Sequence, residues 1–578
     1  MTSERLSGQK ETTKKYHKVS RIDQARMVQA VQSGQTQEFV AEQNDVPRTT
    51  LEHWIKRMRE LKCRHDPEVT AFFESPAGIA FLHRLLIAAL LVFHTSGGCG
   101  LPSLRNFLMM SKLSGFVGSS LGTLHKMSNQ IDRWLKEFGE SERTRLGALM
   151  PNRKITGCGD ETFFHKKMMI VFMEAASGFI LAEQEEEKRD AATWEKVIKT
   201  ALRGLNVELI QVTGDEAGGL TSAVTNLLGI HKSSDLFHIR QEITKGLTGH
   251  LARRTERAER ALKKCLEGKE SHLKEFWQKL EKAGSTPEDR SLVKSGQKTL
   301  QACTREKACR KHLESVKNEQ KIAQEARRAI TEKYHPFDLE TGVARKANRL
   351  HKELSEAYDQ LESIAEKAKC TDNQKKRLKK SRGMLDSLVQ TLAFFWCFAT
   401  RFVFNLQLNE EEKVLFEQFF LPIEYLKMTE RRSGTKERRQ AEVTRKRLEN
   451  TLRRRDGPLL EEDRLKQLQR TARECAEFFQ RSSSCVEGHN GALSLKHHAS
   501  RHLSPGKLSS RVVLHNYFSK RKDGTTAAER FFHQQPKDVF NRLLERVSWP
   551  VRPRKRHRQK GVRTCGAASA LTSLELVA

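Results

Sequence analysis

The chain has 578 residues, which is enough for several domains and at least one large buried core. Its 104 lysines and arginines outnumber 72 aspartates and glutamates, and the formal charge of +32 predicts a polyanionic partner, most commonly nucleic acid. The polar residues 1–18 do not resemble a secretory signal, and the most apolar stretch, residues 79–94, is interrupted by His83 and Arg84. We therefore expect no membrane span and an intracellular, DNA-associated protein, in the cytoplasm or nucleoid of a bacterium or the nucleus of a eukaryote, with reduced cysteines.

Residues 1–20 are predicted to be a basic arm that is disordered until a partner binds, and residues 21–65 to be a helical domain. The domain at residues 21–65 contains a helix, a short helix, a turn at Asn44-Asp45 and an amphipathic helix that follows Val46-Pro47. This order is typical of a helix-turn-helix DNA-binding domain. The apolar face of its last helix consists of Leu51, Trp54, Ile55 and Met58.

Polar residues at the start of that last helix lie on the side away from its apolar face. A recognition helix presents its first turns to base edges in the major groove, and nearby cations contact phosphates. The candidates for base contacts are Arg48, Thr49, Thr50 and His53, and those for phosphate contacts are Lys56 and Arg57. The alternative is a small helical bundle with ordinary solvated charges.

Residues 66–150 form a second helical block that is richer in apolar residues. Segments 104–110, 118–122 and 124–135 are compatible with another helix-turn-helix, and a plain helical linker domain fits equally well.

Residues 151–240 change to short apolar runs that predict strands. The first three strands form an expected antiparallel meander, and the complete order is β-β-β-α-β-α-β. The strands are predicted at 155–160, 168–173, 178–182, 207–213 and 233–237, and the helices at 190–205 and 216–228.

Residues 241–475 are charged and rich in helix-forming residues, which predicts a long helical hairpin or coiled-coil-like insertion with breaks near Gly284 and Pro336. An aromatic-rich part, residues 385–430, should return to a packed core. Residues 476–548 are expected to complete the core that begins at residue 151. The tail, residues 549–578, contains a basic cluster suited to nucleic acid or nuclear import.

Two Gly-Asp pairs follow predicted strands. Asp160 comes at the end of the first strand and Asp215 just after the fourth. If those strands are parallel neighbours, both carboxylates emerge at one edge of the sheet, where their repulsion favours a bound cation such as Mg²⁺. Two such ions can activate an attacking oxygen and stabilise a leaving oxygen at a phosphodiester. The alternative is that each aspartate only caps a turn.

This stretch resembles the ribonuclease-H-like core of the DDE transposase and integrase superfamily, in which one Asp lies on strand one, a second follows strand four, and a Glu lies on a later helix. The resemblance implies an α/β fold, in which a mixed sheet is interrupted by a large all-α insertion and preceded by helix-turn-helix domains. The segment Asp235-Leu236-Phe237-His238 is similar to the Cys/Asp-x-x-His motif of several transposase families. The resemblance implies that His238 contacts the scissile phosphate or holds the site; a helix-capping histidine is the alternative.

The third acid is predicted to be Glu487, which stands in an otherwise uncharged segment and precedes Asn490 by three residues. On a helix these two side chains share a face, and the pair resembles the Glu end of several insertion-sequence transposases. Its flanking residues do not reproduce the Tyr-Arg-Glu-Lys motif of one subgroup. Rival candidates are Glu474 and Glu477.

Histidines after Glu487 allow two interpretations. Cys485, His489, His498 and His502 could bind zinc, although no second cysteine pair completes a known finger. Alternatively, the residues that contact DNA phosphates near the site are His497, His498, Arg501 and His502.

The resemblance implies a transposase in which Asp160, Asp215 and Glu487 hold two Mg²⁺ ions, with Mn²⁺ as a possible substitute. It implies double-stranded DNA partners, namely terminal inverted repeats and target DNA, hydrolysis followed by strand transfer, and at least a homodimer, because two ends are joined. Alternatives are a transposase-derived DNA-binding regulator without catalysis, a metal-dependent nuclease without strand transfer, and a coiled-coil scaffold.

Overall fold

The computed structural model describes residues 19–62, 66–164, 167–282, 290–432, 434–455, 461–499 and 504–548. The chain is mostly helical and contains one five-stranded mixed sheet. It divides into two compact units, residues 1–135 with 539–578, and residues 136–538. The predicted basic arm, except for residues 19 and 20, and the predicted basic tail lie outside the described residues.

The first unit begins with the three predicted helices, α1 (Arg21–Gln32), α2 (Gln37–Gln43) and α3 (Arg48–Lys62). Ser20 caps α1 by accepting from the Asp23 amide, and Thr36 caps α2 by accepting from the Phe39 amide. Asp45 adopts a positive φ of 48° in the turn before α3. The shared core of the three helices includes Val28, Val40, Leu51 and Ile55.

The second helical block contains α4 (Pro67–Glu74), α5 (Pro76–Ala89), a π-helical continuation (Leu90–Ser96), α6 (Leu101–Met110) and α7 (Leu121–Leu149). The C-terminal helix α23 (Val539–Arg546) packs against α5, where His83 Nε2 lies 2.8 Å from the Val547 carbonyl. Arg84 lies over the ring of Phe540, 5.0 Å from its centroid. These contacts explain the two polar residues that interrupt the apolar stretch 79–94.

Two helical segments, Pro76–Ser96 and Asp372–Asn405, are long and apolar enough to cross a membrane by length and composition alone. A buried core helix has the same properties. In the first segment Leu82, Leu86 and Leu90 are buried in the protein.

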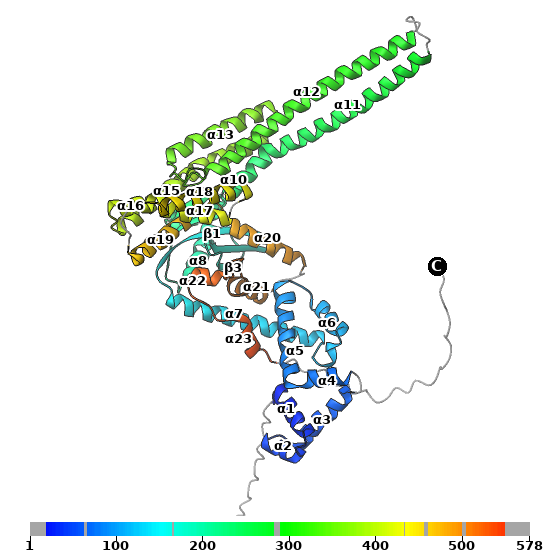
Figure 1. The fold of residues 1–578 in the computed structure, drawn as a ribbon, viewed down its shortest axis with the longest axis vertical. Coiled ribbons are helices and arrows are strands. Elements are labelled where there is room, and N and C mark those ends of the chain that lie inside the picture. The colour runs from blue at the N-terminus through cyan, green and yellow to red at the C-terminus, as the bar shows by residue number, and fades with distance from the viewer. Residues whose placement is uncertain are drawn as a thin grey trace, which may run out of the picture. The chain divides into compact units, whose positions relative to one another are not determined.

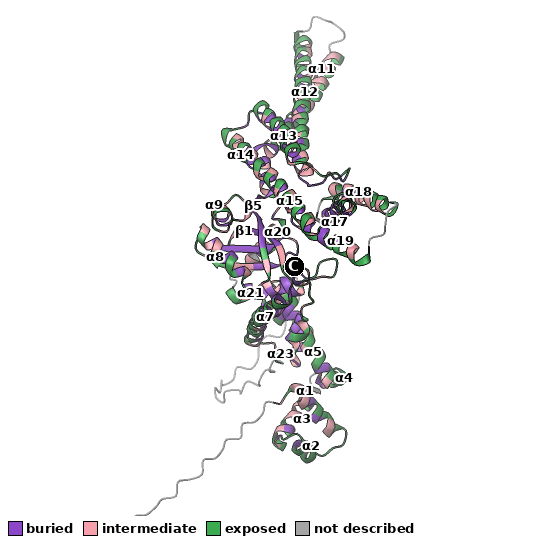
Figure 2. Cartoon of the chain, turned by 90° about the vertical axis from the view of Figure 1, so that its left-hand side faces the viewer, coloured by how far each residue is buried: buried purple, intermediate pink, exposed green. Residues whose placement is uncertain are grey.

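The second unit contains the sheet, whose strand order is β3-β2-β1-β4-β5. Its strands are β1 (Arg153–Phe164), β2 (Lys167–Glu174), β3 (Ile180–Glu186), β4 (Val207–Gly214) and β5 (His231–Ser234). The first three strands form the predicted antiparallel meander, and β4 is parallel to both β1 and β5. The fifth strand begins two residues earlier than predicted. Most strand residues are buried (Figure 2).

Helices cover both faces of the sheet. On one face lie α8 (Ala191–Leu202) and α9 (Gly218–Ser222), which fall within the predicted helices. A Cβ atom on Gly159 would come within 3.1 Å of the Trp194 ring, and one on Gly214 would come within 2.7 Å of the Gly159 carbonyl oxygen. Glycine is therefore needed before both aspartates because the strands and this helical layer approach closely.

The opposite face of β1 is covered by α20 (Ser484–Ala499), and α21 (Pro505–Val513) packs beside it on β3. Val486 of α20 packs with Cys158 and Val171. Because side chains alternate along a strand, Cys158 and Asp160 face α20 while Gly159 faces α8.

The long segment between β5 and α20 is helical, as predicted. Its helices are α10 (Leu236–Ile243), α11 (Gly249–Lys282), α12 (Arg290–Lys333), α13 (Ala347–Lys367), α14 (Asp372–Gly383), α15 (Leu385–Asn405), α16 (Glu410–Leu415), α17 (Leu421–Arg432), α18 (Thr435–Arg453) and α19 (Glu462–Glu477). Helices α11 and α12 form the predicted long hairpin (Figure 1). The predicted break near Pro336 is confirmed because α12 ends at Lys333, whereas Gly284 lies outside the described residues.

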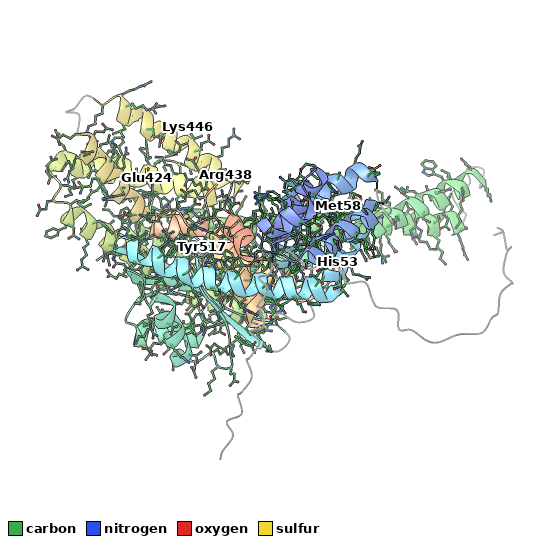
Figure 3. All side chains as sticks on the ribbon, turned by 90° about the horizontal axis from the view of Figure 1, so that it is seen from below. His53, Met58, Glu424, Arg438, Lys446 and Tyr517 are labelled. Carbon is green, nitrogen blue, oxygen red and sulfur yellow. The ribbon has the colours of Figure 1, made fainter. Side chains whose placement is uncertain are left out.

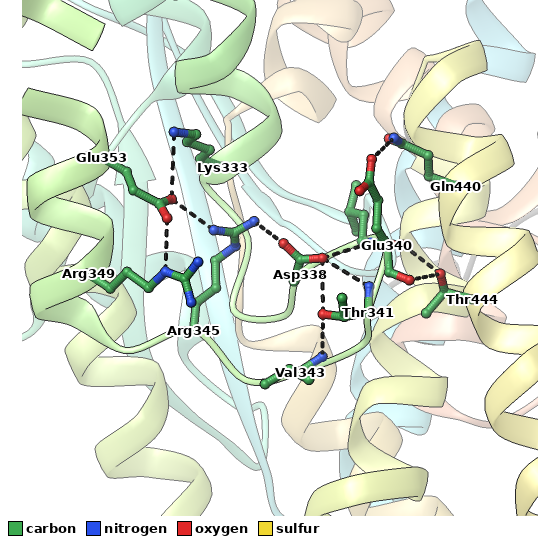
Figure 4. A network of polar contacts seen from close by, with 11 residues as sticks. Lys333, Asp338, Glu340, Thr341, Val343, Arg345, Arg349, Glu353, Gln440 and Thr444 are labelled. Carbon is green, nitrogen blue, oxygen red and sulfur yellow. Dashed lines mark hydrogen bonds and ion pairs between the residues drawn. The ribbon is translucent and has the colours of Figure 1, made fainter. Parts of the chain in front are cut away.

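A polar network holds the connection between α12 and α13 against α18 (Figure 4). Arg345 forms ion pairs with Asp338 and with Glu353, the latter at 2.9 Å. Thr444 of α18 donates to the Leu339 carbonyl at 2.7 Å. The aromatic-rich segment beside it forms the predicted core, and its buried side chains include Phe395, Phe416, Phe420 and Tyr425.

Candidate metal centre

The register of the sheet places the two predicted aspartates side by side. Gly159 of β1 is paired with Gly214 of β4, so Asp160 and Asp215 each follow the same rung of the sheet. Asp215 accepts a hydrogen bond from the Ala217 amide at 3.1 Å, which is the turn-capping role considered for it. Its negative charge nevertheless contributes to raising the pKa of Asp160 and the pKa of His238.

Helix α20 brings Glu487 and Asn490 to this edge of the sheet. Asn490 Nδ2 donates a hydrogen bond of 2.7 Å to Asp160 Oδ2, and Glu487 Oε1 lies 3.3 Å from His238 Nε2. Asp160, His238 and Glu487 each offer one ligand atom, and these atoms lie within 4.8 Å of one another. Three of the four predicted site residues therefore converge, with Asp215 beside them.

The electrostatics of the cluster favour a cation. Burial and the charges of Glu487 and Asp215 raise the pKa of Asp160 to about 7, against the hydrogen bond from Asn490. A carboxyl group is perturbed in this direction when negative charges gather in a poorly solvated place without a compensating ion. Carboxylate oxygens are also the ligands that Mg²⁺ prefers.

His238 lies beside Asp235, the residue that caps α10. The Asp235 carboxylate caps this helix by accepting from the Phe237 amide at 2.7 Å, and it also accepts from the Ser483 hydroxyl. His238 Nε2 lies 3.7 Å from Asp235 Oδ2. Burial opposes the charged imidazole, but Glu487, Asp235 and Asp215 outweigh it and raise the pKa of His238. The helix cap is thus Asp235, and His238 faces the acids.

The rival acids lie elsewhere. Glu477 is at the end of α19, where its carboxylate lies 3.8 Å from Arg153 at the beginning of β1. Glu474 is exposed on the same helix. Among the described residues, neither joins the group of possible metal ligands that includes Asp160.

Among the described residues, the cysteine and histidines proposed to bind zinc do not come together as a group of possible metal ligands. His489 instead forms a close contact with the buried carboxylate of Glu183, and the hydrogen bond between Cys158 and Cys485, together with burial, raises the pKa of Cys158. The side chain of His498 and all of Arg501 and His502 lie outside the described residues. His497 stacks on Phe164 with 3.9 Å between ring centroids.

Sequence reasoning missed Lys232, which lies in β5 and has an almost fully buried side chain. Its Nζ donates to the Gly214 carbonyl at 2.9 Å and lies 4.0 Å from Glu216. Burial lowers the pKa of Lys232, although Glu216 and Asp215 act in the opposite direction. Lys232 was overlooked because the strand was predicted to begin at residue 233, whereas β5 begins at His231.

The helix-turn-helix candidates divide into two groups. Arg48, Thr49, His53 and Lys56 are exposed, and Arg48 forms ion pairs with Glu38 at 2.8 Å and Glu52 at 3.4 Å. Figure 3 marks His53 and the buried Met58 of α3. Thr50 is half-buried. Arg57 is also half-buried, and burial together with the charge of Arg21 lowers its pKa to about 10.

Residues 416–559 match the family described as "Family of unknown function (DUF6399)". The matched segment includes α20 with Glu487 and Asn490, whereas Asp160 and Asp215 precede it. No curated protein matches the sequence.

Proposed function

We propose that this protein is a DDE-type DNA transposase with a ribonuclease-H-like core, which hydrolyses a phosphodiester at the end of a DNA element and transfers that end to target DNA. The observation that carries the proposal is the convergence of Asp160 of β1 with Glu487 from a helix far along the chain, beside Asp215, which directly follows the neighbouring parallel strand β4. Such an arrangement is suited to two-metal chemistry on a phosphodiester.

The donor set fits Mg²⁺ or Mn²⁺ because it is made of carboxylates, and burial together with the charges of Glu487 and Asp215 raises the pKa of Asp160. Asp160, Asp215 and Glu487 would hold two ions, which when bound activate an attacking oxygen and stabilise the leaving one. Asn490 fixes one Asp160 oxygen through its hydrogen bond. The raised pKa of His238 favours an imidazolium that can donate a hydrogen bond to a phosphate oxygen.

The first unit supports the DNA-binding part of the proposal. Its three-helix order and the exposed side chains at the beginning of α3 suit recognition of terminal inverted repeats in the major groove. Joining two ends requires two active sites, so the active species is a homodimer or a larger oligomer on DNA. The proposed location is with the genome, in the nucleoid or the nucleus.

The decisive experiment uses the full chain with labelled DNA from both sides of its own coding sequence, because the ends of a transposable element enclose its transposase gene. With Mg²⁺ we expect site-specific cleavage that leaves a 3′-hydroxyl, followed by joining to a target plasmid. Asp160→Ala and Asp215→Ala should abolish both steps and retain end binding. Undiminished cleavage by either variant contradicts the proposed site, and cleavage without joining identifies a nuclease.

A further inference from the structure

A cleft of about 1880 Å³ adjoins the candidate site. Its walls come from α10, α12, α17, α18, α19, the beginning of α20 and residues 520–530. Lysines and arginines supply 14 of its lining residues, against six acidic ones. Figure 3 labels Glu424 and Arg438, two of these charged side chains.

The acidic side chains of the cleft are largely neutralised by cations of the cleft itself. Glu332 forms ion pairs with Arg328 and Lys436, at 2.6 and 2.9 Å. Glu424 is paired in the same way with Lys427 and Arg473, and Glu437 with Arg481. The remaining lysines and arginines therefore leave the cleft with an excess of positive charge.

Two pairs of arginines in the cleft repel each other. Burial and the charge of Arg240 lower the pKa of Arg327, and burial and the charge of Arg521 lower the pKa of Arg530 to about 10. Arg327 is held by a 2.9 Å hydrogen bond to Thr244, and Arg530 by two hydrogen bonds to the Ser177 carbonyl. These bonds hold Arg327 and Arg530 near arginines of the same charge. An anion bound between the two arginines of a pair would reduce their repulsion.

The cleft lies close to the acids of the candidate site, although none of them lines it. Phe237 lines the cleft and directly precedes His238, and Cys485 lines the cleft two residues before Glu487 on the first turn of α20. An elongated ligand with regularly spaced negative charges that extends beyond this end of the cleft would bring a phosphate to the acids.

We propose that this cleft binds the phosphodiester backbone of the DNA whose scissile bond lies at Asp160, Asp215 and Glu487. The identity of the ligand as substrate DNA rests on the proposed function, while its polyanionic character rests on the charges of the cleft. The helical region between β5 and α20 thereby acts as part of the DNA-binding surface of the second unit.

The first test is a matched pair of charge-reversal variants of the full chain. Arg240→Glu, Lys321→Glu and Lys522→Glu replace exposed cleft cations that form no ion pair among the described residues. Lys196→Glu, Arg257→Glu and Lys379→Glu make the same change in net charge at exposed positions outside the cleft. The probe is a fluorescein-labelled 30-base-pair duplex, titrated at several NaCl concentrations.

We expect the cleft variant to lose affinity by about 10–100-fold near 0.15 M salt and to lower the slope of log K against log salt by up to about 3 units. The control triple should change affinity less than about 3-fold. Equal affinities and slopes for the two triples overturn the proposal.

A second measurement locates the contact independently of the first unit. Lysines are acetylated with and without the duplex and quantified by mass spectrometry; Lys427, Lys436 and Lys522 should be protected by DNA, and Lys196 and Lys379 should not. Unprotected cleft lysines in the bound protein overturn the inference. If the wild-type chain cleaves DNA while its cleft stays unprotected, the cleft inference alone fails. If the cleft is protected but no DNA is cleaved with Mg²⁺, the proposed function alone fails.

Discussion

Asn490 donates a hydrogen bond to Asp160 across 330 residues of sequence, at a distance of 2.7 Å. This bond joins α20 to β1 at the place where Glu487 approaches the strand. It fixes Asp160 Oδ2, while Asp160 Oδ1 accepts a hydrogen bond of 2.9 Å from the Glu161 amide. Asn490 is therefore assigned to positioning the acids rather than to the chemical step.

Asn490→Ala should lower the rate of DNA cleavage by roughly 10-fold and raise the Mg²⁺ concentration needed for half-maximal activity, because residues that orient metal ligands commonly contribute 10–100-fold. A merely structural role would not shift the metal requirement. Gly491→Ala, at an open exposed position of the same helix, should leave both values unchanged. Equal metal dependence in Asn490→Ala and the wild type would contradict the assignment.

Asp160→Asn should stabilise the metal-free protein, and increasingly so as the pH rises from 5 to 8. The folded-state pKa of Asp160, about 7, lies above the ordinary aspartate value of 3.8, so the folded wild type holds a proton that the unfolded chain releases. Wild-type stability therefore falls as the pH rises through this range, and the variant escapes the loss.

Thermal melting in EDTA measures this difference, which we expect to reach about 1–2 kcal/mol at pH 8, since one pKa unit corresponds to about 1.4 kcal/mol and partial exposure reduces the effect. Asp463→Asn, at an exposed position of α19, serves as the control and should show no such trend. A variant that is no more stable at pH 8 than at pH 5, relative to the wild type, would refute the prediction.

Glu487→Gln should reduce cleavage by at least about 100-fold, because it removes a proposed metal ligand. Glu477→Gln should retain cleavage, since Glu477 pairs with Arg153 at 3.8 Å rather than with the acids, and such partly exposed pairs contribute about 1 kcal/mol or less. Rates measured side by side on the same labelled DNA decide between the two acids. The reverse order of activities would assign the third ligand to Glu477.

Arg48→Ala should weaken binding of element ends by about 5–50-fold, mainly for the specific sequence. The ion pairs of Arg48 with Glu38 and Glu52 are exposed and weak, so DNA can replace them. Arg26→Ala, an exposed change on α1, should leave specificity intact. Competition assays with specific and random duplexes measure the difference, and an unaltered preference in Arg48→Ala would exclude it from base recognition.

Sequence patterns predicted the strands along the chain and the places of Asp160 and Asp215 at their ends, because buried strands require apolar runs. The structure adds that β1 and β4 are parallel neighbours and that close packing requires Gly159 and Gly214. Glu487 was predicted from its uncharged surroundings and its spacing to Asn490, which a helix converts into a shared face. The bond from Asn490 to Asp160 depends on packing between distant segments, which no local pattern encodes. The same holds for the burial of Lys232 in β5 and for the electrostatic effect of Arg21 on Arg57.

The long separation between Asp160 and Asn490 has a consequence during synthesis. A ribosome adds roughly 5–20 residues each second, so about half a minute passes between the emergence of the first acid and that of α20. Throughout that interval the nascent chain has a basic N-terminal domain and two aspartates but lacks Glu487. The order of the chain thus delays assembly of the cluster until α20 has been synthesised, and under the proposed function a product terminated before α20 would bind DNA without cutting it.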